Sequence, residues 1–304
     1  QLKCSRQTAG KAFALCENYT GGVPVIKRST DNFVADDTTV ALPVSIGAQP
    51  PAANDFCRQQ AFYDLMIGLN PTNDEEVYVG GIEIFKTTTA FSGTTSAMWT
   101  QLTDWTINPT AAGNATANSL DGVHSDHHVM AFCPTQTSRV VFGCDGGVYY
   151  SNNSGTAIGE RNKDYNVTQI YKGSLDQSVV NNKMLGGLQD NGSQLLTNPA
   201  PIGASTEVYG GDGCWEFIDK QQQYMVVSYV YNTYIYSTYA GVATAYIAND
   251  NGGNDGDFVN QCALDSNLNI LYANGTSGTT YRIYRYAINP STGATTTTTL
   301  TNAA

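Results

Sequence analysis

The sequence predicts an all-β protein built from repeated four-stranded units. Three observations support this fold class: Gly (30 residues) and Tyr (19 residues) are abundant, only 13% of residues are charged, and a short apolar segment recurs along the chain. Short strands joined by many turns need this composition, because aromatic residues favour strands and Gly favours turns. The sequence has no long amphipathic helices rich in Ala, Glu, Lys and Leu.

The repeat is an apolar segment that ends in a small residue. Its six copies begin 64, 63, 43, 42 and 45 residues apart, and a period in the low forties is typical of a four-stranded β-propeller blade. The copies are residues 13–16, 77–80, 140–143, 183–186, 225–228 and 270–273. We therefore expect about six blades, which form a whole propeller or part of a larger one.

Each unit repeats the same parts in the same order. An apolar segment and a turn signal precede the repeated segment, and an alternating strand follows it, so three strands per unit can be recognised, with a weaker fourth. The following strands are 25–29, 82–87, 148–151, 193–197, 233–237 and 282–286. We assign residues 1–294 to the propeller, with a first blade that lacks its innermost strand and an insertion loop at 106–123. Residues 295–304 are predicted to be a Thr-rich tail or linker.

The third strand of several units ends in a recognisable turn motif. Residues Ser151-Asn152-Asn153-Ser154-Gly155 resemble the Asp-box, Ser-x-Asp-x-Gly-x-Thr-Trp, and residues 29–31 and 87–89 look like decayed copies. We expect the Asn or Asp side chain to cap the backbone of the turn between strands three and four, with Gly at a positive φ.

With further motifs, these turns resemble the Asp-box (BNR) propellers of the sortilin and xyloglucanase-like superfamily. The further motifs are residues 124–128, 143–149, 186–192 and 210–213. The likeness is strongest to propellers of large bacterial surface proteins that carry a C-terminal secretion-sorting module. This resemblance covers roughly residues 60–290 and implies a propeller fold at the cell surface or outside the cell.

Charge and cysteine content limit the partners and the compartment. A net charge of -11 with only 15 Lys and Arg argues against nucleic acid and anionic membranes, which need a basic surface. No apolar run is long enough to span a bilayer.

Seven cysteines without a CxxC pair favour an oxidising compartment over a zinc site, and Cys133 and Cys144 are predicted to form a cross-strand disulfide. The candidate glycosylation sites are Asn18, Asn114, Asn152, Asn166, Asn191 and Asn274.

All three histidines fall within residues 124–128. If this segment is a strand, alternation places His124, Asp126 and His128 on one face. Such a face could bind a divalent metal or act as acid and base, although a single strand spaces these side chains widely. The alternative is a polar cluster that fixes strand register or holds water.

Asp-Gly and Asn-Gly turns recur after the second strand of several units. They are strong signals for tight hairpins, and they could also place carboxylates along one rim. Asp145, Asp190 and Asp212 are therefore candidate catalytic residues for cleavage of a glycosidic bond. Asp250, Asp255 and Asp257 are candidate calcium ligands, so the possible cofactor is Ca²⁺ or another divalent metal.

The aromatic residues also allow two interpretations, interior packing and sugar stacking. They are Trp215, Tyr229, Tyr231, Tyr234, Tyr236, Tyr239, Tyr281, Tyr284 and Tyr286.

The sequence leaves two candidate functions. The first is a secreted or cell-surface module that binds protein or polysaccharide without catalysis, in an extracellular assembly or as part of a longer chain. The alternative is a xyloglucanase-like glycoside hydrolase with paired Asp carboxylates. The sequence favours the binding module, because every repeated motif has a structural explanation.

Overall fold

The computed structural model describes residues 1–18, 22–46, 55–107, 120–165, 167–178, 182–198, 204–250 and 255–301. Within these ranges the strands form six four-stranded antiparallel sheets, and the only helical element is the 3-10 turn η1 (Ser96–Met98). None of the helical structure described there is long and apolar enough to cross a membrane. Four-stranded antiparallel sheets of this kind are the blades of β-propellers, so the predicted all-β fold class is confirmed.

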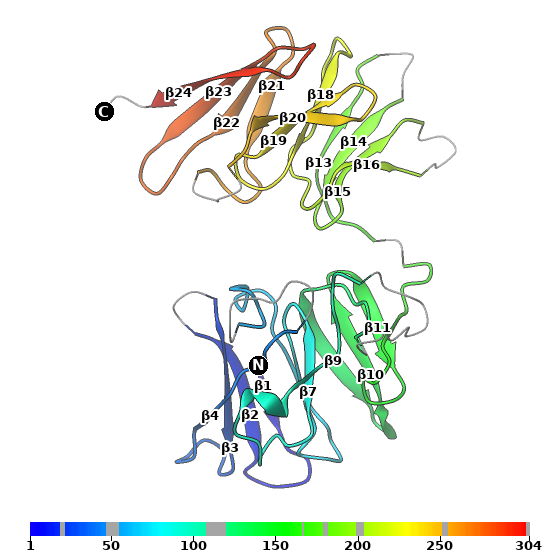
Figure 1. Cartoon of the computed structure of the whole chain (residues 1–304), viewed down its shortest axis with the longest axis vertical. Helices are drawn as coiled ribbons and strands as arrows, with labels where there is room; N and C mark the ends of the chain where they lie inside the picture. Colours follow the sequence, from blue (N-terminus) through cyan, green and yellow to red (C-terminus); the bar gives the residue numbers. More distant parts are fainter. Residues whose placement is uncertain are drawn as a thin grey trace. The chain divides into compact units, whose positions relative to one another are not determined.

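The chain divides into two compact units, and the first is Gln1–Asn166. Unit 1 runs from blue to green in Figure 1 and contains three sheets. Sheet 1 is β1 (Leu2–Cys4), β2 (Ala12–Glu17), β3 (Pro24–Ser29) and β4 (Thr38–Val40). Sheet 2 is β5 (Met66–Leu69), β6 (Val77–Gly80), β7 (Ile84–Thr87) and β8 (Thr100–Gln101). Sheet 3 is β9 (His127–Cys133), β10 (Gln136–Cys144), β11 (Gly147–Ser151) and β12 (Gly159–Glu160).

Unit 2, Val167–Ala304, contains the other three sheets. Sheet 4 is β13 (Ile170–Leu175), β14 (Met184–Leu188), β15 (Gly192–Leu196) and β16 (Thr206–Tyr209). Sheet 5 is β17 (Phe217–Ile218), β18 (Tyr224–Ser228), β19 (Tyr234–Thr238) and β20 (Ala243–Ala248). Sheet 6 is β21 (Cys262–Asp265), β22 (Ile270–Asn274), β23 (Arg282–Ile288) and β24 (Thr295–Thr301). All six sheets are meanders in which sequential strands pair.

The hydrophobic core of each unit lies between successive sheets. In unit 1, Phe13 and Leu15 of sheet 1 pack with Val79 and Phe85 of sheet 2. In unit 2, tyrosines of sheets 5 and 6 fill the equivalent space, including the fully buried Tyr234. Each large apolar side chain buried in this way contributes about 1.5–3 kcal/mol. The recurring apolar segment is therefore the second, buried strand of each sheet.

Two element boundaries that were predicted from the sequence are wrong. The first sheet does not lack its first strand, because Leu2–Cys4 pairs with β2 from Leu2↔Ala14 to Cys4↔Ala12. Residues 295–301 are not a tail, because all seven residues of β24 pair with β23. Thr is β-branched and favours strands, so the composition that suggested a linker also suits an exposed edge strand. Residues 108–119 of the predicted insertion loop lie outside the described residues.

The expected turn after the third strand is present. In sheet 3, the Ser151 hydroxyl donates to Asn153 Oδ1 (2.9 Å) and accepts the Gly155 N–H (2.8 Å). Asn153 Oδ1 also accepts the Ala157 N–H at 2.9 Å, and Gly155 has φ 81°. Sheet 1 repeats this pattern at Ser29, whose hydroxyl bonds to Asp31 Oδ1 at 2.8 Å. These side chains close the turns, which confirms their expected structural role.

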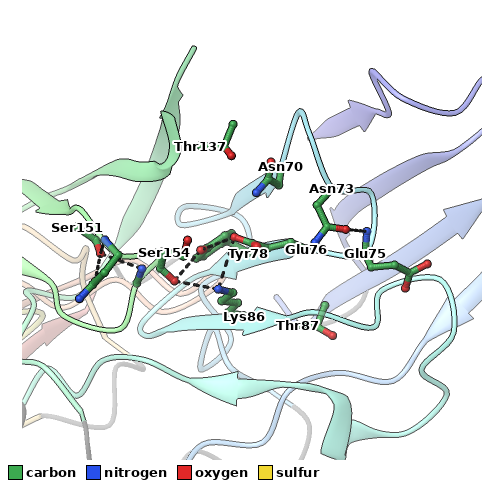
Figure 2. Close-up of polar contacts among 12 residues, drawn as sticks. Asn70, Asn73, Glu75, Glu76, Tyr78, Lys86, Thr87, Thr137, Ser151 and Ser154 are labelled. Carbon is green, nitrogen blue, oxygen red and sulfur yellow. Dashed lines mark hydrogen bonds and ion pairs between the residues drawn. The ribbon is translucent and has the colours of Figure 1, made fainter. Parts of the chain in front are cut away.

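A side chain from the preceding sheet holds each of three such turns. Lys86, directly before the turn of sheet 2, donates to the Ser154 carbonyl of sheet 3 at 3.0 Å, and Tyr78 donates to the same oxygen at 2.8 Å. Figure 2 shows these contacts together with Glu76, which accepts the Tyr78 hydroxyl and lies 3.5 Å from Lys86 Nζ.

The same arrangement recurs twice. Arg28 of sheet 1 donates to the carbonyls of Ala90 and Gly93 in sheet 2, at 2.6 and 2.9 Å. Tyr236 of sheet 5 donates to the Pro290 carbonyl of sheet 6 at 2.9 Å. Arg28 and Lys86 each come directly before the last residue of a third strand, and Tyr236 lies two residues before the end of β19. Adjacent sheets are thus joined by polar contacts at their turns as well as by the core.

Candidate functional site

A cluster of acidic and aromatic side chains lies where the first strands of sheets 2 and 3 meet. Strands β5 and β9 of unit 1 are neighbours. Tyr63 and Asp64 lie in the loop before β5, Asp126 directly precedes β9, and Asp145 lies in the turn between β10 and β11. The tertiary fold therefore brings together residues that are up to 82 positions apart in the sequence.

Asp145 is held by two side chains. Its Oδ1 lies 2.6 Å from His128 Nε2, and its Oδ2 accepts the Tyr63 hydroxyl at 2.8 Å. The rings of Tyr63 and His128 pack edge to face, with centroids 5.0 Å apart. The Asp145 side chain is only 15% exposed. These contacts fix its carboxylate at the edge of the cluster, beside solvent.

Asp126 lies deeper, and hydrogen bonds do not fully offset the cost of burying its carboxylate. It is 9% exposed, and its Oδ1 is buried without a hydrogen-bond partner. A carboxylate oxygen of Asp126 lies within 4.8 Å of one of Asp145. Burial, with a smaller contribution from the charge of Asp145, raises the pKa of Asp126. Two carboxylates this close disfavour ionisation of both.

Asp64 is the innermost member of this acidic cluster, which we define as Asp64, Asp126 and Asp145. It is fully buried, and neither of its carboxylate oxygens has a hydrogen-bond partner. Burial, followed by the charge of Asp126, raises the pKa of Asp64 to about 8. The cluster can therefore take up protons near neutral pH or attract a cation.

The expected His124, Asp126 and His128 face does not form. The strand begins only at His127, Asp126 has φ 63°, and the register shifts between Gly143 and Cys144 of the partner strand. Alternation therefore fails before β9, and donor atoms of these three residues do not converge. His127 is fully buried with neither ring nitrogen hydrogen-bonded, and burial lowers its pKa to about 3. It stays a neutral part of the interior.

The other candidate carboxylates lie in unit 2. Asp212 Oδ1 accepts the N–H of Asp190 at 3.1 Å, and Asp190 has a positive φ of 58° in the hairpin between β14 and β15. Both thus support local backbone structure. Asp255 pairs with Arg282 at 3.3 Å, and Asp257 accepts from Asn274 at 3.3 Å.

Asp250, Asp255 and Asp257 do not form a group of converging carboxylates in the described part of the chain. Residues 251–254, in the middle of this candidate calcium loop, lie outside the described residues.

The predicted disulfide is wrong. All seven cysteines are described, and all are free thiols. Cys133 pairs in register with Gln136 at one end of the β9–β10 hairpin, whereas Cys144 pairs with His127 at the other end. Six residues of strand separate the two ends, about 20 Å at the usual rise, which is far beyond the span of a disulfide.

Three of the six candidate glycosylation sites have an exposed Asn, namely Asn18, Asn152 and Asn191. Asn274 is partly buried, and its side chain bonds to Asp257 and to the N–H of Thr276. Asn114 and Asn166 lie outside the described residues.

Unit 2 contains a pocket of about 660 Å³ over sheet 6. Trp215, Tyr272 and Tyr281 supply its aromatic surface, and its other lining residues are Gln261, Cys262, Ala263, Ala273, Asn274, Thr276, Arg282, Ile283, Leu300 and Thr301. Tyr281 is 71% exposed. Among the described residues that line it, Arg282 is the only charged one, and Asp255 offsets its charge. The described lining is therefore mainly aromatic and apolar, and Lys172 Nζ lies 4.5 Å from the centroid of the Trp215 ring.

Glu216, next to the pocket residue Trp215 in sequence, is buried. It is 1% exposed, its Oε1 accepts the Ser193 hydroxyl at 2.9 Å and the Ser228 N–H at 3.4 Å, and its Oε2 is buried without a partner. Burial outweighs these hydrogen bonds and raises the pKa of Glu216 to about 8. Glu216 is therefore mostly neutral at pH 7.

Sequence reasoning missed Asp64, Tyr63 and Glu216. Asp64 and Glu216 are single acidic residues without a motif, and their burial depends on tertiary packing. One available signal was the position of Asp64, directly before the apolar segment that contains Leu65 and strand β5. Of the aromatic residues, Tyr234, Tyr236 and Tyr286 pack in the interior, whereas Trp215 and Tyr281 line the pocket.

No protein-family model and no curated protein matches the chain. Among solved structures, it is similar to a GH74 enzyme of Niastella koreensis, with 14% identity and a TM-score of 0.35 over 97% of this chain and 46% of that chain. It is also similar to YCF48 bound to the D1 peptide, with 9% identity and a TM-score of 0.31 over 98% of this chain and 79% of that chain. The chain thus spans less than half of the GH74 enzyme. Both neighbours are β-propeller folds, and likenesses this distant say nothing about the site.

Proposed function

We propose that the protein is a secreted or cell-surface module that binds a neutral glycan, without catalysis, in the aromatic pocket of unit 2. The observation that carries this proposal is the combination of Trp215, Tyr272 and Tyr281 in one pocket. Aromatic rings stack on the apolar faces of sugars, while hydroxyl and amide groups around them bond to sugar hydroxyls. Thr276, Asn274 and Gln261 supply such groups here.

Charge favours a neutral ligand over an anionic one. Arg282 is the only basic residue in the described part of the lining, and it is paired with Asp255 at 3.3 Å. The chain as a whole carries a net charge of -11, which repels polyanions. None of the described lining residues has a carboxylate, and an acid and base pair for glycoside hydrolysis needs two. Binding is therefore better supported than catalysis at this pocket.

Isothermal titration calorimetry with soluble cello- and xylogluco-oligosaccharides tests the proposal. We expect Tyr281→Ala to weaken binding by about 10-fold, the usual scale for loss of one stacking ring. Tyr281 is exposed, so its removal should leave the fold intact. Tyr246→Ala removes another tyrosine of unit 2 that is 52% exposed and outside the pocket, and it should bind normally. Equal affinity in both variants, or binding of anionic polygalacturonate instead, would contradict the proposal.

The extracellular location rests on composition and on the resemblance to surface propellers. The exposed sequons at Asn18, Asn152 and Asn191 are compatible with it. Protease treatment of intact cells, followed by detection of the full-length protein, is the direct measurement. Protection of the protein in intact cells and cleavage only after lysis would exclude a surface location.

A specific observation also favours a second function, glycoside hydrolysis in unit 1. Carboxylate oxygens of Asp126 and Asp145 lie within 4.8 Å, and retaining glycosidases place their two carboxyl groups about 5 to 5.5 Å apart. The raised pKa of Asp126 suits a proton donor. Release of reducing ends from xyloglucan, lost in Asp145→Asn, would support this function, whereas no release by the wild type would exclude it for that substrate.

A further inference from the structure

We propose that Asp126 and Asp145 bind a divalent cation that prefers oxygen ligands, with Ca²⁺ as the best candidate. This site lies in unit 1 and is independent of the glycan pocket. It also differs from the ligand sets that the sequence suggested, because His124 does not take part and Asp145 does. The inference rests on the position of the two carboxylates and on one buried oxygen that has no partner among the residues that the structure describes.

The buried oxygen is Oδ1 of Asp126. It is shielded from solvent and has no hydrogen-bond partner, and a buried carboxylate oxygen without a partner is costly. Asp126 also has φ 63°, an uncommon conformation for a residue other than Gly. Its carbonyl accepts the Asp145 N–H at 3.3 Å, which ties the two loops together. The fold thus holds a buried carboxylate beside a second one, within 4.8 Å.

The surroundings add a further carboxyl group and fix the second carboxylate. Asp64, whose two buried oxygens have no partner among the described residues, is the further carboxyl group near Asp126. Tyr63 and His128 hold Asp145 in place through separate oxygens, at 2.8 and 2.6 Å. Such a set of acidic groups is stabilised by a cation that bridges them.

The type of donor atom selects the class of cation. The proposed ligand atoms are carboxylate oxygens, which suit Ca²⁺, Mg²⁺ and Mn²⁺ rather than soft metals. The nearby imidazole of His128 is already bonded to Asp145. Ca²⁺ accepts irregular geometry and mixed ligands, whereas Mg²⁺ demands near-octahedral geometry and keeps several waters. An irregular, partly buried pair of loop carboxylates therefore favours Ca²⁺.

Titration of the EDTA-treated full chain with CaCl₂, monitored by thermal unfolding, tests the site. Ligands that bind only the folded state raise the unfolding temperature, so we expect a saturable increase that NaCl of equal ionic strength does not produce. Asp126→Asn should lower the Ca²⁺ affinity by at least about 10-fold. Asp37→Asn removes a carboxylate of the same unit whose side chain is 60% exposed, and it should respond as the wild type does.

Terbium luminescence provides a second readout that does not depend on unfolding. Tb³⁺ replaces Ca²⁺ at oxygen sites and is sensitised by nearby aromatic rings. Tyr63→Phe should dim this signal, because the Tyr63 side chain contacts the proposed ligand Asp145. No response of the wild type to millimolar Ca²⁺, or equal responses of wild type and Asp126→Asn in both assays, would overturn the proposal. Sugar binding by the Asp126→Asn variant separates this result from the proposed function.

Discussion

Glu216→Gln changes a single buried carboxyl group in unit 2 and should alter the pH dependence of stability. The pKa of Glu216 is raised to about 8 in the folded chain, mainly by burial, from the ordinary value of 4.5 for a Glu side chain. Between these values the folded state holds a proton that the unfolded chain releases. The free energy of unfolding therefore falls as pH rises, by about 1.4 kcal/mol per pH unit. Between pH 5 and pH 7 the loss is about 3 kcal/mol, and it is complete above about pH 8.

The assay is urea unfolding by circular dichroism at a series of pH values from 5 to 9. Gln has no proton to lose, so the stability of Glu216→Gln relative to the wild type should increase by about 3 kcal/mol between pH 5 and pH 7. Subtracting the two profiles removes contributions from other groups, including Asp64. Glu207→Gln changes an exposed carboxylate of β16 and should leave the profile unchanged. A difference between Glu216→Gln and wild type that is constant with pH would refute the reasoning.

Three further predictions concern stability and use the same urea assay. Asn153→Ala removes the acceptor that closes the turn of sheet 3 and should cost about 1 kcal/mol; an unchanged midpoint would exclude this role. Lys86→Met leaves Glu76 without its cation and should cost about 3 kcal/mol, whereas adding Glu76→Gln should restore part of the loss. Gly187→Ala places a Cβ 2.6 Å from a backbone oxygen and should cost about 2 kcal/mol. Gly173→Ala, whose Cβ would meet nothing closer than 3.7 Å, should cost much less.

The repeat could be predicted from the sequence because it is a local pattern. The buried second strands, such as Val77–Gly80, are apolar runs with turn residues on both sides, and this pattern needs no knowledge of tertiary contacts. The turn at Ser151 was predictable for the same reason. The edge strands could not be predicted in this way. Leu2–Cys4 and Thr295–Thr301 are largely exposed, so neither carries an apolar pattern, and their pairing is decided by the neighbouring strand.

The candidate site was predicted only in part. Asp145 and His128 were recognised from their motifs, but their contact depends on the hairpin between β10 and β11. The role of His124 was wrong because strict alternation holds only within a regular strand, and Asp126 with φ 63° interrupts it. Asp64 lies in no motif, and its desolvation is a property of the packed chain. Single acidic residues become informative only when their surroundings are known.

The contacts from Arg28, Lys86 and Tyr236 to the next turn have a consequence for how the repeats diverge. Each of these side chains is encoded in one repeat and satisfies carbonyl groups of the following repeat. If a repeat were duplicated or moved along the gene, its turn would follow a different repeat. The donor side chain of that preceding repeat would then differ from the one that the turn contacts now. The repeats are therefore adapted to their order, and substitutions at such a donor should be accompanied by changes in the turn one repeat later.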